Sequence, residues 1–381
     1  QYYPWGPVRS IQYTGGKTLT KTYDQNYEID LIGSNRTNGL NLDFRVDVAG
    51  KIDQIVQGAV TRAYSYDPLD RLRLITNGAQ AIDTYSYDSV GNRLSVQAGS
   101  AAAVPYTYVA GSNRLYKIGT AVKRQYDSAG NTVFAPELAT LGYDERGRLV
   151  GRSVPLMMIQ TGFDYNGRGE RVLKEYYGMS ASPTHYMYSE FGGIAVIKEQ
   201  TGYRNVIYID QLPVGLIDNG AMMAIETDHL GTPRVVANGD SVLWRWELVA
   251  GSTTSGGSNA FGEQLPNEDV DGNGTLYNFD LRFPGQIFDG ALNYIRDYEP
   301  GTGRYVESDP IGLRGGTNTY AYVNADPLRW IDRHGLEGFH SQTLCPFGNC
   351  EPYKPAKCGP CGQSFGACYG NCMNFFTPWQ V

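Results

Sequence analysis

The sequence predicts an all-β fold built from β-hairpins that stack on one another. Three observations support this prediction. A short motif with tyrosine, aspartate and glycine recurs at intervals of roughly 20 residues, a spacing typical of repeat architectures. Residues beside the motif alternate between apolar and polar types, as in strands with one buried face. The chain is also rich in glycine and tyrosine, with 47 and 29 of 381 residues.

The recurring motif is Tyr-Asp-x-x-Gly-Arg/Asn-x-Leu, and each copy predicts a hairpin turn. Aspartate at the first turn position and glycine three residues later suit a type I turn that is closed by a residue with positive φ. A single hairpin cannot bury its apolar face, so each copy must pack against its neighbours. The copies begin at Tyr66, Tyr87, Tyr126 and Tyr143, and a looser copy is expected at Phe163-Asp164-Tyr165-Asn166-Gly167-Arg168.

Composition and charge exclude several classes of protein. No run of about 18 apolar residues is present, so no transmembrane segment is expected. The net charge of −7 gives no basic patch for nucleic acid, so no nucleic-acid partner is expected. The chain begins at Gln1 without a Met or a signal-like apolar run, which indicates a processed piece or a part of a longer protein.

The Tyr-Asp repeats resemble the YD repeats of Rhs proteins, of the C subunits of insecticidal Tc toxins and of teneurins. A second series of motifs follows the order of the Rhs-associated core, and this order makes the resemblance specific. The series is Asp228-His229-Leu230-Gly231-Thr232-Pro233-Arg234, Trp244-Arg245-Trp246, Ala260-Phe261-Gly262, Leu281-Arg282-Phe283-Pro284-Gly285-Gln286, Tyr298-Glu299-Pro300-Gly301-Thr302-Gly303-Arg304-Tyr305, Ser308-Asp309-Pro310-Ile311-Gly312-Leu313, Tyr320-Ala321-Tyr322-Val323-Asn324 and Pro327-Leu328.

The resemblance implies a fold and a domain organisation. In the family, the repeats spiral into a β-shell that encloses a toxic C-terminal domain, and the core forms a plug where that domain joins. A chain of this length resembles the C-terminal end of such a shell, or a short version whose open strand edges invite partners. The implied domains are a YD-repeat shell segment at 1–225, the core or plug at 226–336 and a variable, irregular Cys-rich tail at 337–381.

Two functions are compatible with this organisation. The first is a β-shell that encloses or presents a C-terminal effector segment in a secreted polymorphic toxin. The second is a structural or adhesive surface protein that self-assembles through open sheet edges and a disulfide-stapled tail. Both imply a secreted or cell-surface bacterial protein. The implied partners are the rest of a larger Rhs chain or copies of this chain, and an immunity protein or a cell-surface target.

The resemblance also implies an aspartyl self-cleavage site, which would be the only chemistry of the chain. The cut is expected between Leu336 and Glu337, and the catalytic pair is expected to be Asp309 and Asp332. Two carboxylates that are held close together share a proton, so one acts as an acid and the other as a base in peptide hydrolysis. Arg304 is expected to orient one of the carboxylates.

The second cleavage motif departs from the family pattern, because Arg333 replaces its proline. Proline would fix φ and help to hold a strained peptide, and a cation beside Asp332 favours the charged carboxylate. We therefore expect slow or absent cleavage, although His334 could transfer a proton near neutral pH. The alternative is that Asp309 and Asp332 only form turns, because Asp-Pro and Asp-x-x-Gly are common turn sequences.

A calcium site is a further hypothesis, on a loop that resembles the EF-hand template. Oxygen-bearing residues stand at loop positions one, three and five, glycine stands at six, and a carboxylate stands at twelve. The last carboxylate is Asp rather than Glu, which weakens bidentate binding, and the flanks read as strands. The alternative is a polar hairpin tip. The candidate ligands are Asp269, Asp271, Asn273 and Asp280.

All six cysteines lie in the tail, so residues from 337 onward form a separate module. A segment this short cannot bury a large core, so cross-links or a metal would have to hold it. Three disulfides suit an extracellular protein, a zinc site with four thiolates is the rival, and an irregular end with free thiols is the third alternative. The cysteines are Cys345, Cys350, Cys358, Cys361, Cys368 and Cys372.

Overall fold

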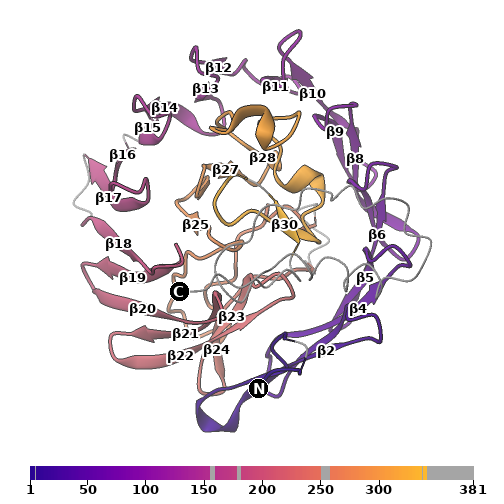
Figure 1. Ribbon diagram of the computed structural model, residues 1–381, viewed down its shortest axis with the longest axis vertical. Coiled ribbons are helices and arrows are strands. Elements are labelled where there is room, and N and C mark those ends of the chain that lie inside the picture. Colours follow the sequence, from indigo (N-terminus) through magenta and orange to yellow (C-terminus); the bar gives the residue numbers. More distant parts are fainter. Residues whose placement is uncertain (5, 155–158, 178–181, 250–257, 337, 341–381) are drawn as a thin grey trace, which may run out of the picture. The chain divides into compact units, whose positions relative to one another are not determined.

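The computed structural model describes residues 1–4, 6–154, 159–177, 182–249, 258–336 and 338–340 (Figure 1). These residues form almost entirely β structure, which confirms the predicted fold class. They contain no α-helix and only the 3-10 turns Thr14–Gly16, Gly312–Arg314 and Val323–Ala325. No helix among them is long and apolar enough to cross a membrane.

The first large sheet contains 11 antiparallel strands in the order of the sequence. Each strand pairs with the next one along the chain, as expected for stacked hairpins. The strands are β1 (Ser10–Gln12), β2 (Thr18–Tyr23), β3 (Ile29–Ser34), β4 (Asn41–Val46), β5 (Ile52–Gln57), β6 (Val60–Tyr66), β7 (Leu72–Asn77), β8 (Gln80–Tyr87), β9 (Arg93–Ala98), β10 (Val104–Tyr108) and β11 (Leu115–Ile118).

The second large sheet contains 13 antiparallel strands, also in the order of the sequence. Its last three strands extend past residue 226, so the predicted boundary between shell and core falls inside one sheet. The strands are β12 (Gln125–Tyr126), β13 (Thr132–Ala135), β14 (Ala139–Tyr143), β15 (Leu149–Val154), β16 (Ile159–Tyr165), β17 (Arg171–Tyr177), β18 (Thr184–Tyr188), β19 (Ile194–Glu199), β20 (Gly202–Ile209), β21 (Leu212–Asp218), β22 (Ala221–Thr227), β23 (Pro233–Asn238) and β24 (Ser241–Arg245).

Two small sheets follow the large ones, and Figure 1 shows the strands of the first inside the curve of the large sheets. The core segment between 258 and 336 is mostly loop, held by these short pairings. The first small sheet contains β25 (Ile287–Phe288), β26 (Asn293–Tyr294), β27 (Tyr298–Glu299) and β28 (Arg304–Tyr305), and the second contains β29 (Trp330–Ile331) and β30 (Phe339–His340).

The repeat motif forms the predicted hairpin turn, and its aspartate fixes the turn. In the copy at Asp88, Oδ1 accepts hydrogen bonds from the backbone N–H groups of Val90 at 3.0 Å and Asn92 at 2.9 Å. Gly91 has φ of 90°, a conformation that glycine adopts without a steric penalty. These side-chain hydrogen bonds replace the backbone hydrogen bonds between strands, which end at the turn.

The looser copy has a different register from the one predicted. The turn residue is Asn166 rather than Asp164, because Asn166 Oδ1 accepts from the N–H groups of Arg168 at 2.9 Å and Glu170 at 3.0 Å. Asparagine has the same side-chain oxygen as aspartate, so it performs the same local role. The true motif of this copy is therefore Tyr165-Asn166.

The motif tyrosines link each hairpin to the preceding one. Each hydroxyl donates to the carbonyl oxygen of the first residue of the preceding odd-numbered strand, at 2.6–2.9 Å, and we call this series the tyrosine ladder. Phenylalanine would cover the same apolar surface without this bond. The pairs are Tyr66 with Ile52, Tyr87 with Leu72, Tyr108 with Arg93, Tyr126 with Leu115, Tyr143 with Thr132, Tyr165 with Leu149, Tyr188 with Arg171 and Tyr208 with Ile194.

The tyrosine ladder also joins the two large sheets. Tyr126 of β12 donates to Leu115 of β11 at 2.8 Å, although these strands belong to different sheets. Beside it, the Arg124 N–H donates to the Tyr116 carbonyl at 2.8 Å. The repeat therefore continues across the gap where the regular strand pairing stops.

We expect Tyr143→Phe to destabilise the protein by about 1 kcal/mol, because it removes one half-buried hydrogen bond and leaves the Thr132 carbonyl without its donor. Urea unfolding followed by tryptophan fluorescence measures this change. Tyr203→Phe is the matched control, because that ring is 53% exposed and lies outside the tyrosine ladder. Equal stability of Tyr143→Phe and the wild type would contradict a stabilising role for the ladder.

A cluster of buried aromatic rings forms the centre of the core segment. The Tyr298 and Tyr322 ring centroids are 4.4 Å apart, and Phe283 and Tyr305 each lie 5.8 Å from Tyr322. All four side chains are buried. Rings packed in this way fix the loops that carry them, because few other arrangements fill the same volume.

A buried arginine anchors the core segment to the second large sheet. Arg171 stands at the motif position where Leu72 and Leu149 are buried in other repeats. Its Nη1 contacts Asp289 Oδ2 at 2.9 Å, and its Nη2 contacts Asp297 Oδ1 at 2.8 Å. Buried charges require such partners, because desolvation of an unpaired ion is costly.

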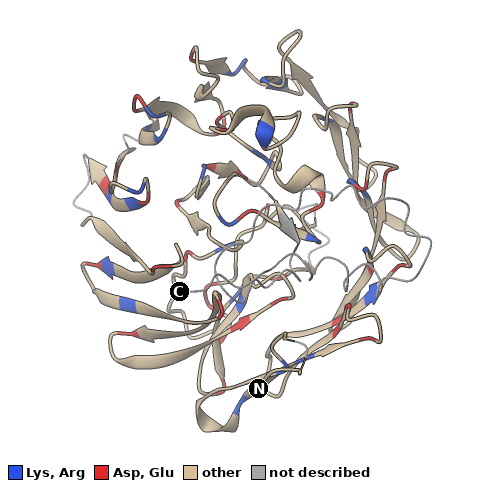
Figure 2. Ribbon diagram, in the orientation of Figure 1, with Lys and Arg blue, Asp and Glu red and all other residues tan. Residues whose placement is uncertain are grey.

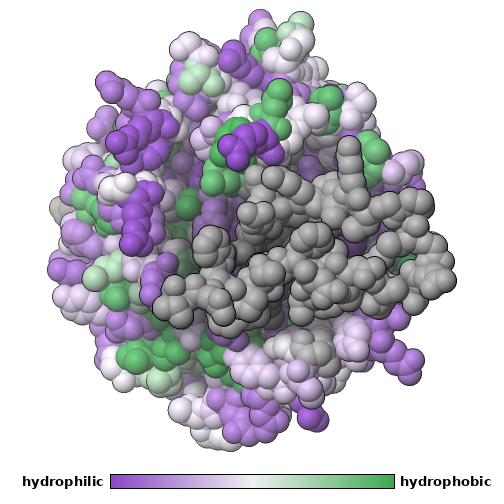
Figure 3. Space-filling view, in the orientation of Figure 1, coloured by the Kyte–Doolittle hydropathy of each residue, from purple (hydrophilic) through white to green (hydrophobic). Residues whose placement is uncertain are grey.

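The charged residues do not separate by sign. Figure 2 shows Lys and Arg interspersed with Asp and Glu along the large sheets. The face drawn in Figure 3 is mostly hydrophilic, with hydrophobic residues in scattered patches. Scattered apolar residues of this kind are normal on a protein surface.

Candidate self-cleavage site

Asp309 lies at the end of an extended segment that follows β28. Its Oδ2 accepts from Arg296 Nη1 at 2.7 Å, and its Oδ1 accepts from the Ile311 N–H at 2.9 Å. The side chain is almost fully buried, with 8% of the residue exposed. The aspartate therefore has a fixed orientation, which is a requirement for a catalytic acid or base.

Asp332 follows β29 and is held equally firmly. Its Oδ2 accepts from the Tyr305 hydroxyl at 2.8 Å, and its Oδ1 accepts from the Leu336 N–H at 3.0 Å. The residue is 4% exposed. Asp332 thus contacts the residue that was predicted to stand on the N-terminal side of the cut.

The structure brings both aspartates to Leu336. A Cβ atom built on Gly315 would lie 2.5 Å from Asp309 Oδ2 and 2.9 Å from the Leu336 carbonyl oxygen, so both oxygens face the same glycine. Arg296 Nη1 also donates to the Gly335 carbonyl oxygen at 3.0 Å. Asp309 therefore lies on the carbonyl side of Leu336, while Asp332 lies on its amide side. Glu337 lies outside the described residues.

The electrostatics of the pair favour retention of a proton. Burial raises the pKa of Asp309, and the nearby Arg296 only partly opposes this effect. Burial also raises the pKa of Asp332, against the Tyr305 hydrogen bond and Arg296, and the charge of Asp309 raises it further. A pair with raised pKa values can hold one shared proton at a higher pH than ordinary carboxyl groups.

The arginine that contacts Asp309 is Arg296, whereas Arg304 contacts other groups in the described part of the chain. Arg304 Nη2 donates to the Asn113 carbonyl at 2.5 Å, and its guanidinium lies 5.2 Å from the Tyr108 ring centroid. Arg296 has φ of 50°, which is unusual for a long side chain and supports its special placement. The sequence around Arg296 carries no local motif that could have identified it.

Arg333 does not lie beside the Asp332 carboxylate, which differs from the expectation. Its Nη1 donates to the Gln211 carbonyl at 3.1 Å, and burial lowers its pKa. His334 is partly exposed to solvent. Burial of the rest of its side chain and the charge of Arg333 lower the pKa of its imidazole. The cation close to Asp332 is Arg296 instead.

The loop proposed for calcium forms local hydrogen bonds. Both carboxylate oxygens of Asp269 accept from the Gly274 N–H, at 3.2 and 3.3 Å, and Asp271 Oδ2 accepts from Asn273 Nδ2 at 2.9 Å. Among the described residues, Asp280 included, no three acidic, His or Cys side chains converge to hold a metal ion. Calcium binding therefore stays a prediction, and the alternative of a polar turn fits these contacts.

The six cysteines lie outside the described residues, so the hypotheses of disulfides, a zinc site and free thiols stay predictions. The same is true of the predicted start of the tail at Glu337. The described part of the chain ends at His340, within β30.

Comparison with known proteins gives consistent results, although no protein-family model matches the chain. It is 27% identical over 288 residues to double-stranded DNA deaminase toxin A of Burkholderia cenocepacia, covering 64% of this chain and 19% of the toxin. It is 25% identical over 199 residues to a probable deoxyribonuclease, RhsA, of Dickeya dadantii, covering 51% and 12%. Toxin protein Tse5 of Pseudomonas aeruginosa is 34% identical over 114 residues, covering 29% and 8%.

Solved structures with the same fold are Tc toxin components. The TcdB2–TccC3 structure without the hypervariable C-terminal region has a TM-score of 0.69 and 18% identity, covering 88% of this chain and 19% of that one. The Photorhabdus luminescens Tc holotoxin pore has a TM-score of 0.70 and 17% identity, covering 89% and 19%. The chain thus spans at most 19% of the length of these relatives. Its repeats, its ordered core motifs and these likenesses show that the chain is similar to proteins of the Rhs/YD-repeat family and has an Rhs-type β-shell fold.

Proposed function

We propose that this chain is the shell and core segment of a secreted bacterial polymorphic toxin, and that it encloses or presents a C-terminal effector segment and cuts itself after Leu336. The fold of the Tc toxin neighbours and the toxin-related names of the relatives support the shell part of the proposal. One observation supports the cutting: two buried aspartates from separate motifs lie on the two sides of Leu336.

In the proposed reaction, a water molecule attacks the carbonyl carbon of Leu336. Asp332, which faces the amide side, takes a proton from this water, and Asp309, which faces the carbonyl side, donates one to the carbonyl oxygen. When the intermediate collapses, the C–N bond breaks, Asp332 gives its proton to the nitrogen of Glu337, and Asp309 regains a proton from a hydroxyl group of the intermediate. The products are a carboxyl group on Leu336 and a new N-terminal amine, so the reaction consumes one water.

The role of Arg296 in this proposal is positioning. Arg296 Nη1 donates both to Asp309 Oδ2 and to the Gly335 carbonyl oxygen. It therefore links the Asp309 motif to the residue that precedes Leu336. Arg296 also lies 3.9 Å from the centre of the Tyr305 ring, whose hydroxyl holds Asp332. Both carboxyl groups are therefore oriented by one connected group of contacts.

We expect the Asp309→Asn and Asp332→Asn variants to remain intact and the wild type to release residues 337–381, slowly if at all. Intact-mass measurement of freshly purified and incubated protein, under reducing and non-reducing conditions, reports cleavage and any disulfides together. Asp53→Asn is the matched control, because it removes a partly exposed carboxylate far along the chain from the site. Efficient cutting by both Asp309→Asn and Asp332→Asn would exclude the aspartyl mechanism.

A complementary variant, Arg333→Pro, restores the proline of the family pattern. No backbone hydrogen bond from the Arg333 N–H is present within the described residues, so proline removes no such bond. We expect this variant to cut faster than the wild type. If it remains uncut while its thermal midpoint is unchanged, the two aspartates are a structural relic.

A structural or adhesive role is the second candidate. The observation that favours it is that β1 and β24 are end strands in the strand order, and that the pairings beyond them in the described residues are short, such as those of Ser10 with Gln1 and of Arg245 with Asn267. Open edges pair readily with other chains.

Size-exclusion chromatography at several protein concentrations separates the two candidates. Self-assembly predicts that the apparent size of the particle increases with concentration, whereas a shell with its own cargo predicts a constant size. An immunity protein or a cell-surface target is the partner proposed for the toxin.

A further inference from the structure

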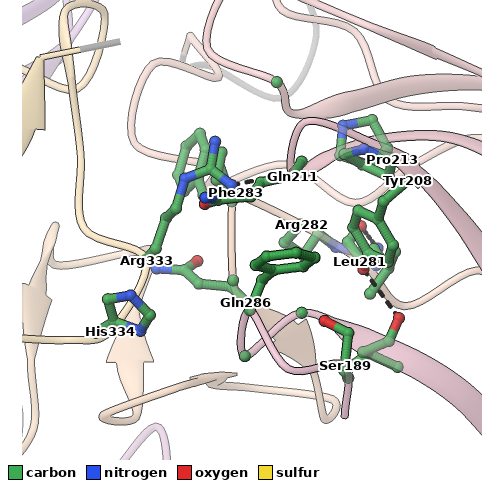
Figure 4. A pocket seen from close by; sticks show the side chains of 18 residues that line it. Ser189, Tyr208, Gln211, Pro213, Leu281, Arg282, Phe283, Gln286, Arg333 and His334 are labelled. Atoms are coloured by element: carbon green, nitrogen blue, oxygen red, sulfur yellow. Dashed lines mark hydrogen bonds between the residues drawn. The ribbon is translucent and has the colours of Figure 1, made fainter. Parts of the chain in front are cut away.

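A small pocket lies beside the segment that carries Arg333 and His334. Its walls come from the β18–β19 and β20–β21 hairpins, from the core segment around Phe283 and Gln286, and from Arg333 and His334 (Figure 4). Its volume is about 50 Å³. A pocket of this volume holds a few water molecules or one small ligand group.

The charge of this pocket is unbalanced. Arg282, Arg333 and His334 line it, and no acidic side chain is among its lining residues. Nη1 of Arg282 donates to both the Phe279 and the Leu281 carbonyls, so this nitrogen already has acceptors. Arg333 makes one hydrogen bond, to the Gln211 carbonyl, and it has no ion pair within the described part of the chain. A guanidinium without a carboxylate partner is a natural site for an anion.

A second, independent observation points to the same ligand. Gln286 is 1% exposed, and its Nε2 has no hydrogen-bond partner in the described structure, whereas its Oε1 accepts from Asn293 Nδ2 at 3.0 Å. Figure 4 shows the Gln286 side chain beside Arg333 and His334. A buried amide donor without an acceptor costs free energy, and a ligand oxygen would relieve that cost.

The remaining walls are apolar. Phe191, Ile194, Leu281, Phe283 and Pro284 line the same pocket. A planar carboxylate matches the planar donor fork of arginine, and a short hydrocarbon chain matches these walls. A phosphate dianion fits less well, because its strong hydration is lost against apolar side chains.

We propose that this pocket binds a short-chain carboxylate, held by the Arg333 guanidinium and the Gln286 amide, with its hydrocarbon part against the apolar walls. The carboxylate belongs either to a free organic acid or to an acidic side chain of a peptide. This proposal does not depend on self-cleavage, since the pocket residues are distinct from the aspartate pair. Its test is a binding measurement, so a failure of one proposal does not affect the other.

The experiment is a titration of the full chain with butyrate, followed by saturation-transfer difference NMR. Butyramide, which has nearly the same shape without the charge, is the ligand control. We expect saturable binding of butyrate, no saturable binding of butyramide, and binding at least about tenfold weaker in Arg333→Gln, because a hydrogen bond to a charged group contributes that much. A parallel titration with N-acetylglutamate amide, which carries a peptide-like acidic side chain, distinguishes the two sources. Tighter binding of butyrate indicates a free organic acid, and tighter binding of N-acetylglutamate amide indicates an acidic side chain of a peptide.

Two further variants keep the test decisive. Arg146→Gln removes an exposed turn arginine with the same change in net charge, and it should bind butyrate like the wild type. Gln286→Glu keeps the acceptor for Asn293 and places a negative charge in the pocket, so it should abolish binding. The proposal is overturned if butyramide binds as well as butyrate, or if Arg333→Gln or Gln286→Glu, folded with a wild-type thermal midpoint, binds butyrate normally.

Discussion

Replacing Arg171 with methionine should destabilise the folded protein by about 3–5 kcal/mol, because it leaves two buried carboxylates without their shared cation. Arg171 contacts Asp289 and Asp297 at 2.9 and 2.8 Å, and all three side chains are almost fully buried. Methionine fills most of the volume, so the loss reflects charge and hydrogen bonding rather than a cavity. The change should also loosen the core segment, since both carboxylates belong to it.

Urea unfolding monitored by tryptophan fluorescence measures this loss. Arg45→Met is the matched control, because Arg45 pairs with Asp53 at 2.7 Å on the surface, where its side chain is 60% exposed. An exposed pair contributes less than about 1 kcal/mol. Similar losses in the two variants would mean that Arg171 does not anchor the core segment.

The second large effect concerns pH and Asp326. This aspartate is 2% exposed, and burial raises its pKa from 3.8 to about 7, although Arg329 and Lys51 oppose the change. The folded state therefore binds the proton more tightly than the unfolded state does. The resulting stabilisation is complete below the unfolded pKa and is lost as the pH rises through about 7. It amounts to a few kcal/mol, because each tenfold increase in proton affinity contributes about 1.4 kcal/mol.

Asp326→Asn should remove this pH dependence, because asparagine resembles the protonated carboxyl group and does not ionise. Relative to the wild type, the variant should gain stability as the pH is raised from about 4 to about 8 in a series of denaturation curves. Asp240→Asn is the control, because the pKa of that exposed carboxylate is lowered to about 2 and lies below the window. A constant difference between Asp326→Asn and wild type across the series would contradict the raised pKa.

The features that could be predicted from the sequence are those with local causes. The turn at Asp88 depends on an aspartate, a glycine and two backbone N–H groups within four residues, so the motif alone predicts it. The register of the copy at Tyr165-Asn166 was missed because asparagine can replace aspartate as the acceptor, whereas Phe163-Asp164 matched the letters better. The division into two large sheets carried no sequence signal, because the tyrosine ladder continues across it.

In the candidate site, too, only the residues that stand in local motifs could be predicted from the sequence. Asp309 and Asp332 were identified because each stands in a short motif, but Arg296 was not, since its contact with Asp309 arises only when the core segment folds. Arg304 was expected to orient a carboxylate, but its Nη2 donates to the Asn113 carbonyl. The side-chain direction of Arg333 also depends on a distant strand connection at Gln211, which no local pattern reveals.

The tyrosine ladder has a consequence for how such chains change length during evolution. Each hydroxyl reaches back across one hairpin, so the bond is repeated every two strands. Insertion or deletion of a whole hairpin therefore leaves every remaining donor opposite an acceptor. Gain or loss of a single strand would reverse the direction of all later strands and separate the donors from their acceptors. Selection should thus permit growth by duplication of paired strands, and the family can vary the number of its repeats without redesigning the contacts between them.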